Sequence, residues 1–281
     1  MKRSLRILVL GLIFVFIFST FAFSSDISNK ILKDVWASRE NLTPLPIFSK
    51  VYGALSLDKA YDIQEKFVKE AVSKGEEIIG YKVAFSSPPA MKKFGAKEPA
   101  YGVLFKSMLL KNGAEIEHSK YYRLFIENEV AIIIGEDVKG PLSSVDELKK
   151  YIKGAAPAIE FPDLRFKELK GITVPDVVAD NAGAAIFLVG DMVPIDNVDV
   201  NSLEVVFSKD GEVINKAPST QAYGGPLKSV LWLVNTLAKR GEGLKAGYII
   251  MTGALGKMVP AKPGHYVEDF GKLGKNEFVV K

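Results

Sequence analysis

The alternation of apolar and polar positions predicts a chain of many short strands with a few helices between them. Strand-like segments rich in Val, Ile, Phe and Tyr recur along the sequence. They lie at residues 78–86, 101–105, 123–138, 155–161, 184–191, 203–217, 247–256 and 265–281. Asp210-Gly211 divides the segment 203–217 into a predicted hairpin. This pattern is typical of an α+β domain built around a curled sheet, without the alternation of a doubly wound fold.

Three amphipathic stretches predict helices. The first follows Ser56, carries apolar residues at helical spacing and stops at Gly75; the second starts with a Ser144–Glu147 capping box and ends near Gly154; the third starts at Pro226. Residues 25–55 are polar and then punctuated by prolines, which indicates an irregular arm. Residues 86–100 carry three prolines and predict a loop with a helical turn, a candidate lid.

The first 24 residues differ from the rest and are typical of a secretory signal peptide. A short basic segment ending at Arg6 precedes a run without charge from Ile7 to Phe23, and small residues suit cleavage before Ser25. The alternative is an uncleaved N-terminal anchor, because the apolar run is nearly long enough to span a bilayer. Either way we expect the folded part to be exported, with the leader as its only contact with a membrane.

The amino-acid composition argues against several classes of function. The chain has a formal net charge of +4, but the leader holds three of its 37 basic residues and none of its 33 acidic residues, so the remainder is close to neutral. That balance gives no reason to expect nucleic-acid binding. Because the sequence contains no cysteine, disulfides, thiolate catalysis and zinc–thiolate sites are excluded. Its two histidines have no metal-ligand spacing, and a Ser-His-Asp triad would need one of them.

Two glutamates interrupt the apolar segment 123–138. Glu127 and Glu129 are two residues apart, so on a strand their carboxylates face the same side. Glu160 lies in the next apolar run after one capped helix and can return to the same part of the sheet. Three carboxylates without histidine or cysteine favour a hard divalent cation, Mg²⁺ or Mn²⁺. A solvent-facing strand edge is the plainer explanation of two spaced glutamates, and the residues alone leave both open.

Other candidate residues admit two explanations each. Lys82, between Tyr81 and Val83, either extends to the surface or lies buried beside carboxylates. Asp180 and Asn181 are explained by turn chemistry or by a ligand site. The segment 251–258, "MTGALGKM", is either a turn or a close approach of the backbone to a ligand.

Several motifs occur together in one known family. The segments "IGYKVAFSS", "YGVLF", "IENEVAIIIGED", "PAIEFPD", "DVVADNAGAAIFLVG" and "TGALGKMVP" stand in the order and at the intervals of the 2-keto-4-pentenoate hydratase and 4-oxalocrotonate decarboxylase group. That group belongs to the fumarylacetoacetate hydrolase superfamily, and the resemblance covers about residues 40–281.

The resemblance implies a mixed β-sandwich roll with a smaller helical N-terminal part, assembled into homo-oligomers. We therefore divide the chain into a signal peptide (1–24), an arm and helix (25–79) and a β-roll catalytic domain (80–281). Glu127, Glu129 and Glu160 stand where the family binds Mg²⁺ or Mn²⁺, and Lys82 stands where it has an active-site lysine. The "ADNA" and "TGALG" motifs nominate substrate-binding residues, namely Asp180, Asn181, Thr252 and Gly253.

The implied activity is that of a metal-dependent hydro-lyase or carboxy-lyase acting on a small 2-oxo acid or its dienol. The sequence departs from the family at Ala100 (an aspartate in hydratases), Gly183 (a serine) and Phe125 (an arginine). These changes spare the metal set but remove polar groups around it, so decarboxylation or tautomerisation survives more easily than hydration. The alternative is an exported binder that holds a small oxo acid on the metal without chemistry.

Overall fold

The computed structural model describes residues 26–281. The expected signal peptide lies outside the described residues. In the described part no helix is both long and apolar enough to cross a membrane.

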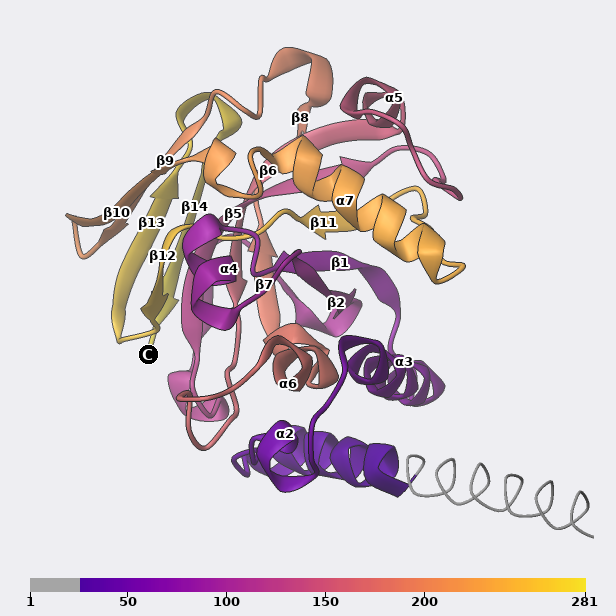
Figure 1. Ribbon diagram of the computed structural model, residues 1–281. Helices are drawn as coiled ribbons and strands as arrows, with labels where there is room; N and C mark the ends of the chain where they lie inside the picture. Colours follow the sequence, from indigo (N-terminus) through magenta and orange to yellow (C-terminus); the bar gives the residue numbers. More distant parts are fainter. Residues whose placement is uncertain (1–25) are drawn as a thin grey trace, which may run out of the picture.

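Two sheets form the body of the molecule (Figure 1). The larger has the strand order β2-β1-β11-β5-β6-β7-β3, with β12 added beside β5 and β8 beside β6. Its strands are β1 (Ile78–Ala84), β2 (Ala100–Phe105), β3 (Leu109–Leu110), β5 (Phe125–Ile134), β6 (Ile152–Phe161), β7 (Ile186–Val189), β8 (Val193–Pro194), β11 (Ile249–Met251) and β12 (Leu255–Pro260).

The smaller sheet has the order β10-β9-β13-β14-β4. It consists of β4 (Ala114–Ile116), β9 (Glu204–Lys209), β10 (Glu212–Pro218), β13 (Gly264–Asp269) and β14 (Lys275–Val280). The predicted hairpin joins β9 to β10, and Asp210 and Gly211 both have the positive φ that a tight hairpin turn requires.

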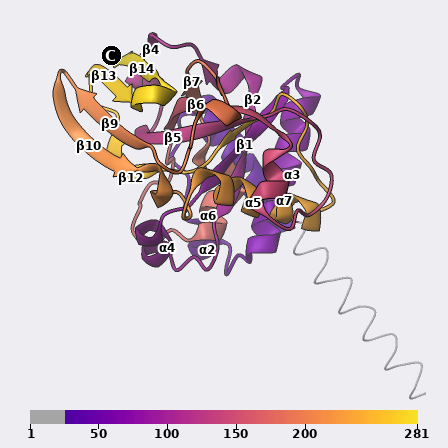
Figure 2. The same cartoon turned by 90° about the horizontal axis from the view of Figure 1, so that it is seen from above.

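Helices cover the face of the larger sheet that points away from the smaller one, as the view from above shows (Figure 2). They are α2 (Phe48–Val51), α3 (Leu57–Ser73), α4 (Pro88–Phe94), α5 (Val145–Lys149), α6 (Val174–Ala179) and α7 (Pro226–Lys239), preceded by a helix over residues 26–41. The Ser56 hydroxyl accepts a hydrogen bond from the Lys59 amide and so caps α3 as predicted.

The two faces of the larger sheet are buried in separate clusters. Between the sheets, residues such as Ile126, Phe161 and Phe278 form one apolar layer. On the other face the strands pack against the helices in the main core. Because successive residues of a strand face opposite sides, Ile126 and Phe161 point toward the smaller sheet, while Glu127 and Glu160 point toward the helical side. The predicted α+β class with a curled, sandwich-like sheet arrangement is confirmed.

Two local predictions are wrong. Residues 26–41 form a helix, where an irregular arm was expected, because Ile31, Val35 and Ser38 recur at helical spacing and are all buried. The helix after Ser144 ends at Lys149 and not near Gly154, because the chain enters β6 at Ile152 and continues pairing with β5. The segment 86–99 contains α4 and is otherwise irregular, as predicted, and Ala100 already begins β2.

Candidate metal centre

Strand register brings the three glutamates together. In the antiparallel pair β5–β6, Glu127 lies directly opposite Glu160, and Glu129 lies opposite Ala158. Directly opposed residues of an antiparallel pair are neighbours on one face of the sheet. Glu129 is two residues along β5 and shares that face, so all three carboxylates project to the same spot.

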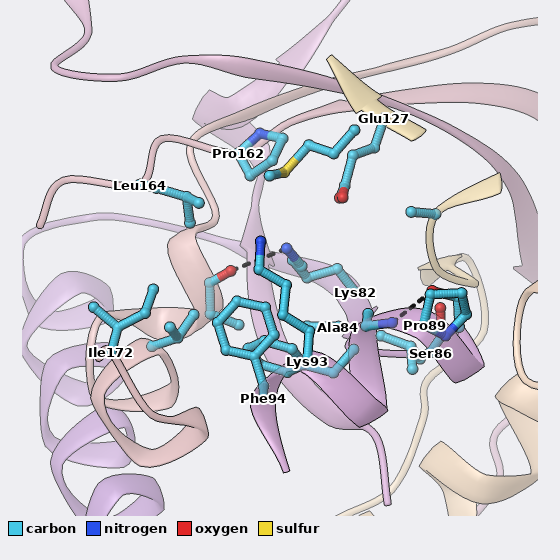
Figure 3. A pocket seen from close by; sticks show the side chains of 18 of the residues that line it. Lys82, Ala84, Ser86, Pro89, Lys93, Phe94, Glu127, Pro162, Leu164 and Ile172 are labelled. Atoms are coloured by element: carbon cyan, nitrogen blue, oxygen red, sulfur yellow. Dashed lines mark hydrogen bonds between the residues drawn. The ribbon is translucent and has the colours of Figure 1, made fainter. Parts of the chain in front are cut away.

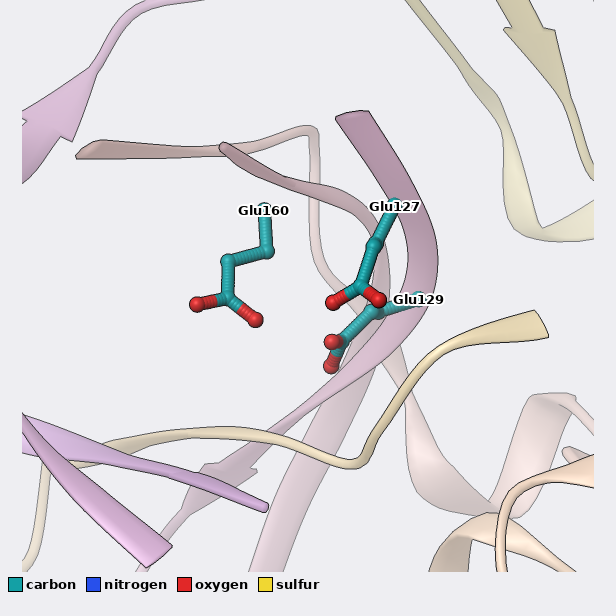
Figure 4. A group of neighbouring side chains, drawn as sticks. All are labelled: Glu127, Glu129 and Glu160. Carbon is teal, nitrogen blue, oxygen red and sulfur yellow. The ribbon is translucent and has the colours of Figure 1, made fainter. Parts of the chain in front are cut away.

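The carboxylates converge on one point (Figure 4). One oxygen from each of Glu127, Glu129 and Glu160 lies within 4.8 Å of the other two. Glu129 and Glu160 are fully buried. Glu129 Oε1 and Glu160 Oε2 have no hydrogen-bond partner among the described residues. Buried acceptors without partners are costly, so the arrangement calls for a positive group between the oxygens.

The acidities of the glutamates reflect this crowding. Burial and the neighbouring Glu160 raise the pKa of Glu127 to about 7. Burial, Glu160 and Glu127 raise the pKa of Glu129 well above its ordinary value. Desolvation and like charge both disfavour an ionised carboxyl, and a bound cation would reverse that effect.

Lys82 supplies one positive charge from β1. Its Nζ lies 2.5 Å from Glu160 Oε1 and donates a 2.9 Å hydrogen bond to the Ala182 carbonyl. Burial lowers the pKa of Lys82, but the attraction of Glu160, Glu127 and Glu129 outweighs burial and the pKa is raised overall. One ammonium does not balance three carboxylates. These contacts decide between the two explanations that the sequence left open for Lys82: it is buried beside carboxylates and does not extend to the surface.

A glycine makes room for this lysine. Gly102 in β2 is paired with Lys82 in β1. A Cβ at Gly102 would lie 2.7 Å from the Asn181 carbonyl oxygen and 3.2 Å from Lys82 Cγ. A glycine between an aromatic and a valine within a buried strand is the signal that could have revealed this close approach.

A pocket of about 250 Å³ opens over Lys82 and Glu127 (Figure 3). Residues from β1, from the segment 84–94 and from the loops after β6 and β11 line it. Most of the lining is apolar, including Phe94, Leu164 and Met258. The expected lid segment thus forms one wall of the pocket. A concave, largely apolar site with a few convergent charges is the usual form of a small-molecule site.

Gly253 acts on the cluster through its backbone. Its amide donates a 2.7 Å hydrogen bond to Glu129 Oε2, which orients that carboxylate. Its φ is +107°, and a Cβ there would overlap the side chain of Ser86. Only glycine fits this close approach. The Thr252 hydroxyl next to it donates to the Val130 carbonyl at 2.7 Å, which ties the turn to β5.

Asp180 belongs to a second group of buried charges, which we call the aspartate–arginine cluster: Asp163, Arg165, Asp180 and Arg39. Arg165 bridges the two aspartates, with Nη1 3.3 Å from Asp163 and Nη2 3.1 Å from Asp180. Arg39 lies 3.2 Å from Asp180 and reaches it from the N-terminal helix. Asp163 also accepts the backbone amides of Tyr122 and Arg123.

The side chain of Asn181 forms hydrogen bonds with the backbone of β2. Its Oδ1 accepts the Val103 amide at 2.8 Å and its Nδ2 donates to the Val103 carbonyl at 2.9 Å. Asn181 and Ala182 both have left-handed φ, near +52°; asparagine adopts this conformation more readily, whereas at Ala182 it costs about 1–2 kcal/mol. This bend presents the Ala182 carbonyl to Lys82. The side chains of Asp180, Asn181 and Thr252 thus bond within the protein, and their role in substrate binding stays a prediction.

The three departures from the family fall around the site. Ala100 is buried at the start of β2, opposite Ala84. Gly183 has a φ of +68°, and a Cβ there would lie 3.2 Å from Leu164, which lines the pocket. Phe125 begins β5 beside Pro260 of β12. Neither histidine contributes: both lie outside the pocket, and His265 is exposed beside Glu277.

Comparison with known proteins identifies the family. The sequence family described as fumarylacetoacetate (FAA) hydrolase C-terminal matches residues 78–280, most of the chain. The chain belongs to the fumarylacetoacetate hydrolase family. This confirms the family resemblance, and the match begins close to the expected boundary at residue 80.

Curated relatives lie in one branch of this family. The TodF product hydratase of Pseudomonas putida strain F1 is 30% identical over 81% of this chain and 85% of its own length. The 4-oxalocrotonate decarboxylase of Pseudomonas sp. strain CF600 is 30% identical over 78% of this chain and 83% of its own.

A solved structure has the same fold over nearly its whole length. The 4-oxalocrotonate decarboxylase of Pseudomonas putida G7, complexed with magnesium and adipate, superposes with a TM-score of 0.87 at 27% identity. The match covers 92% of this chain and 98% of that one. The helical N-terminal part therefore belongs to the shared fold as well as the β-roll.

Proposed function

We propose that this protein is a divalent-metal-dependent lyase, of the hydratase or decarboxylase type, acting on a small 2-oxo acid or 2-hydroxydienoate. One observation carries the proposal: two buried carboxylates and the half-buried Glu127 converge beside a buried lysine at the base of an apolar pocket. The relatives named as a hydratase and a decarboxylase, and the neighbour that holds magnesium and a dicarboxylate, support it.

The residues fit Mg²⁺ or Mn²⁺. The donor set is three carboxylates with oxygens within 4.8 Å of one another, and hard divalent cations prefer oxygen ligands. Two of the carboxylates each leave one buried oxygen without a partner, Glu129 Oε1 and Glu160 Oε2. We assign Glu127, Glu129 and Glu160 as the residues that would hold the ion. When bound, the ion supplies a Lewis acid for the oxygens of a 2-oxo acid.

The protein's own groups complete the site. Lys82 lies next to Glu160 and lines the pocket. Its ammonium can pair with the negative charge that develops when a proton or CO₂ leaves the substrate. Glu127 both belongs to the cluster and lines the pocket. The Gly253 amide holds Glu129 in place. The apolar lining limits water near the developing charge, which strengthens each of these interactions.

Turnover measured with and without metal tests this function. We expect Mg²⁺- or Mn²⁺-dependent conversion of a 2-hydroxydienoate or an unsaturated 2-oxo diacid, followed by its ultraviolet absorbance. Glu127→Gln should abolish this conversion, and Glu115→Gln, an exposed glutamate paired with Lys281, is the matched control. Activity that survives EDTA unchanged would rule the proposal out.

A second function, binding without turnover, has one observation in its favour. Ala100, where the family's hydratases carry an aspartate, is buried and offers no acid or base. Under this alternative, oxalate or pyruvate would raise the melting temperature only with Mg²⁺ present, and no compound of a substrate panel would be consumed. A rate in the wild type that is lost in Lys82→Ala would exclude it.

We also propose that the protein is exported and forms homo-oligomers. The basic and apolar character of residues 1–24 supports export, either with cleavage or with retention as an anchor. Cell fractionation with mass spectrometry of the mature N-terminus tests export, and light scattering of the purified protein tests assembly. Full-length protein in the cytoplasm would contradict export.

A further inference from the structure

Lys93 is the one residue of α4 that brings a charge to the pocket. It is the last but one residue of this helix, which runs from Pro88 to Phe94 and ends at Gly95 in the left-handed conformation. The lining residues include three charged side chains, Lys82, Lys93 and Glu127. In the close-up, Lys93 extends from α4 toward the pocket that Lys82 also lines (Figure 3).

The two lysines differ in how their charges are balanced. Lys82 is buried and paired with Glu160 at 2.5 Å. Within residues 26–281, Lys93 has no carboxylate within ion-pair distance, and its recorded contact is with the ring of Phe94, at 5.3 Å from Nζ to the centroid. Lys93 therefore has charge to offer a ligand, whereas the charge of Lys82 is already shared with the glutamates.

The surroundings of Lys93 make that charge selective. Beyond Glu127, the two lysines and two serines of the segment after β1, the pocket wall is apolar, with Leu164, Ile172 and Met258 among its residues. Such a wall accepts an apolar substrate tail, and apart from Lys82 it holds no other positive group than Lys93 to pair with a second carboxylate. A lysine that packs its stem along apolar surface and presents its ammonium end supplies that partner.

We propose that Lys93 is a specificity-determining residue that selects 2-oxo acids with a second, distal carboxylate. The inference rests on the proposed function, since the 2-oxo acid end must sit at the glutamates and Lys82. Lys93 then pairs with the far end of the substrate. An ammonium that pairs with a carboxylate stabilises its charged form, so Lys93 contributes to binding and not to loss of that carboxylate as CO₂.

The test compares matched ligands that differ only in the distal group. Dissociation constants are measured calorimetrically, with Mg²⁺, for 2-oxoadipate against 2-oxohexanoate and for 2-oxoglutarate against 2-oxopentanoate. The proteins are the wild type, Lys93→Met and the control Lys92→Met. Lys92 is exposed on the same short helix and does not line the pocket. Both side chains are on the surface, and melting temperatures check that the variants fold.

We expect the wild type to bind at least one diacid about tenfold more tightly than its monoacid partner. Lys93→Met should remove this preference while leaving monoacid affinity unchanged, and Lys92→Met should keep it. Metal-dependent binding of monoacids without preference for diacids overturns the role of Lys93 alone. Equal weakening of both ligands in Lys93→Met overturns it too, since Lys93 would then pair with the common carboxylate. Absence of any metal-dependent binding overturns this inference together with the proposed function.

Discussion

The two groups of buried charges described above, both within residues 26–281, differ in the balance of positive and negative charge. The aspartate–arginine cluster sets two carboxylates against two guanidiniums. The glutamate cluster of Glu127, Glu129 and Glu160 sets three carboxylates against Lys82 alone. A balanced buried network serves the fold, because each charge finds its partner within the chain. An unbalanced one needs a positive group from outside the chain to be complete, which makes the glutamate cluster the candidate functional site.

We expect the aspartate–arginine cluster to stabilise the fold, so a substitution in it should lower the free energy of unfolding. Arg165→Met leaves Asp163 and Asp180 without their shared partner in a buried setting, and we expect it to lower the free energy of unfolding by about 3–5 kcal/mol. Chemical denaturation measures this. Arg123→Met is the control, since the Arg123 guanidinium donates to the carbonyls of Phe166 and Lys167 and has no carboxylate partner within residues 26–281. Equal losses in the two variants would show that the cluster has no special role in stability.

A substitution in the glutamate cluster should instead reduce turnover without lowering the stability of the metal-free protein. Glu129→Gln removes a proposed metal ligand, so turnover should fall at least about 100-fold, because even outer-shell partners of metal ligands contribute roughly 10- to 100-fold. In EDTA its melting temperature should equal or exceed that of the wild type, because one buried like charge is gone. A large loss of stability in EDTA, of the kind predicted for Arg165→Met, would place Glu129 among the structural residues.

The stability of the metal-free protein should depend on pH because of the glutamate cluster. The pKa of Glu127 is raised from 4.5 to about 7, so between these values the folded state holds a proton that the unfolded state has lost. Stability should therefore be full below pH 4.5 and fall as pH rises toward 7, by about 3 kcal/mol. Denaturation in EDTA at a series of pH values measures the slope, and Glu127→Gln should flatten it. A wild-type slope unchanged in that variant would assign the effect to other groups.

The affinity for Mg²⁺ should rise over the same range of pH in which the stability of the metal-free protein falls. Because ligands must be deprotonated to bind, metal affinity should rise with pH between about 5 and 7. Calorimetric titration with Mg²⁺ checks this trend. Affinity that stays constant across this range would mean that the carboxylates are already ionised without the metal.

Much of the fold and of the glutamate cluster could be predicted, because both depend on local patterns. Period-2 alternation places Glu127 and Glu129 on one face, and the structure has them there. The position of Glu160 depends on the register of β5 with β6, which pairs it with Glu127. Periodicity does not determine register, and here the family resemblance supplied that information.

Side chains that pair over long distances could not be predicted. Asp180 and Arg39 are far apart in sequence, and their ion pair depends on how the N-terminal helix docks. That helix, residues 26–41, was itself missed, because its charged residues and the prolines after it obscured the buried spacing of Ile31 and Val35. Polar residues in a motif such as "ADNA" look alike whether they face a ligand or bond to backbone, as Asn181 does.

The central claim is that the glutamate cluster holds a divalent ion, and Mn²⁺ binding tests it most directly. Metal-free full-length protein is titrated with Mn²⁺, and free Mn²⁺ is followed by its electron paramagnetic resonance signal. The account predicts that each chain takes up one Mn²⁺, that Mg²⁺ displaces it, and that the Glu127→Gln, Glu129→Gln double variant takes up none. A double variant that binds Mn²⁺ as the wild type does, or a wild type that binds none, would contradict it.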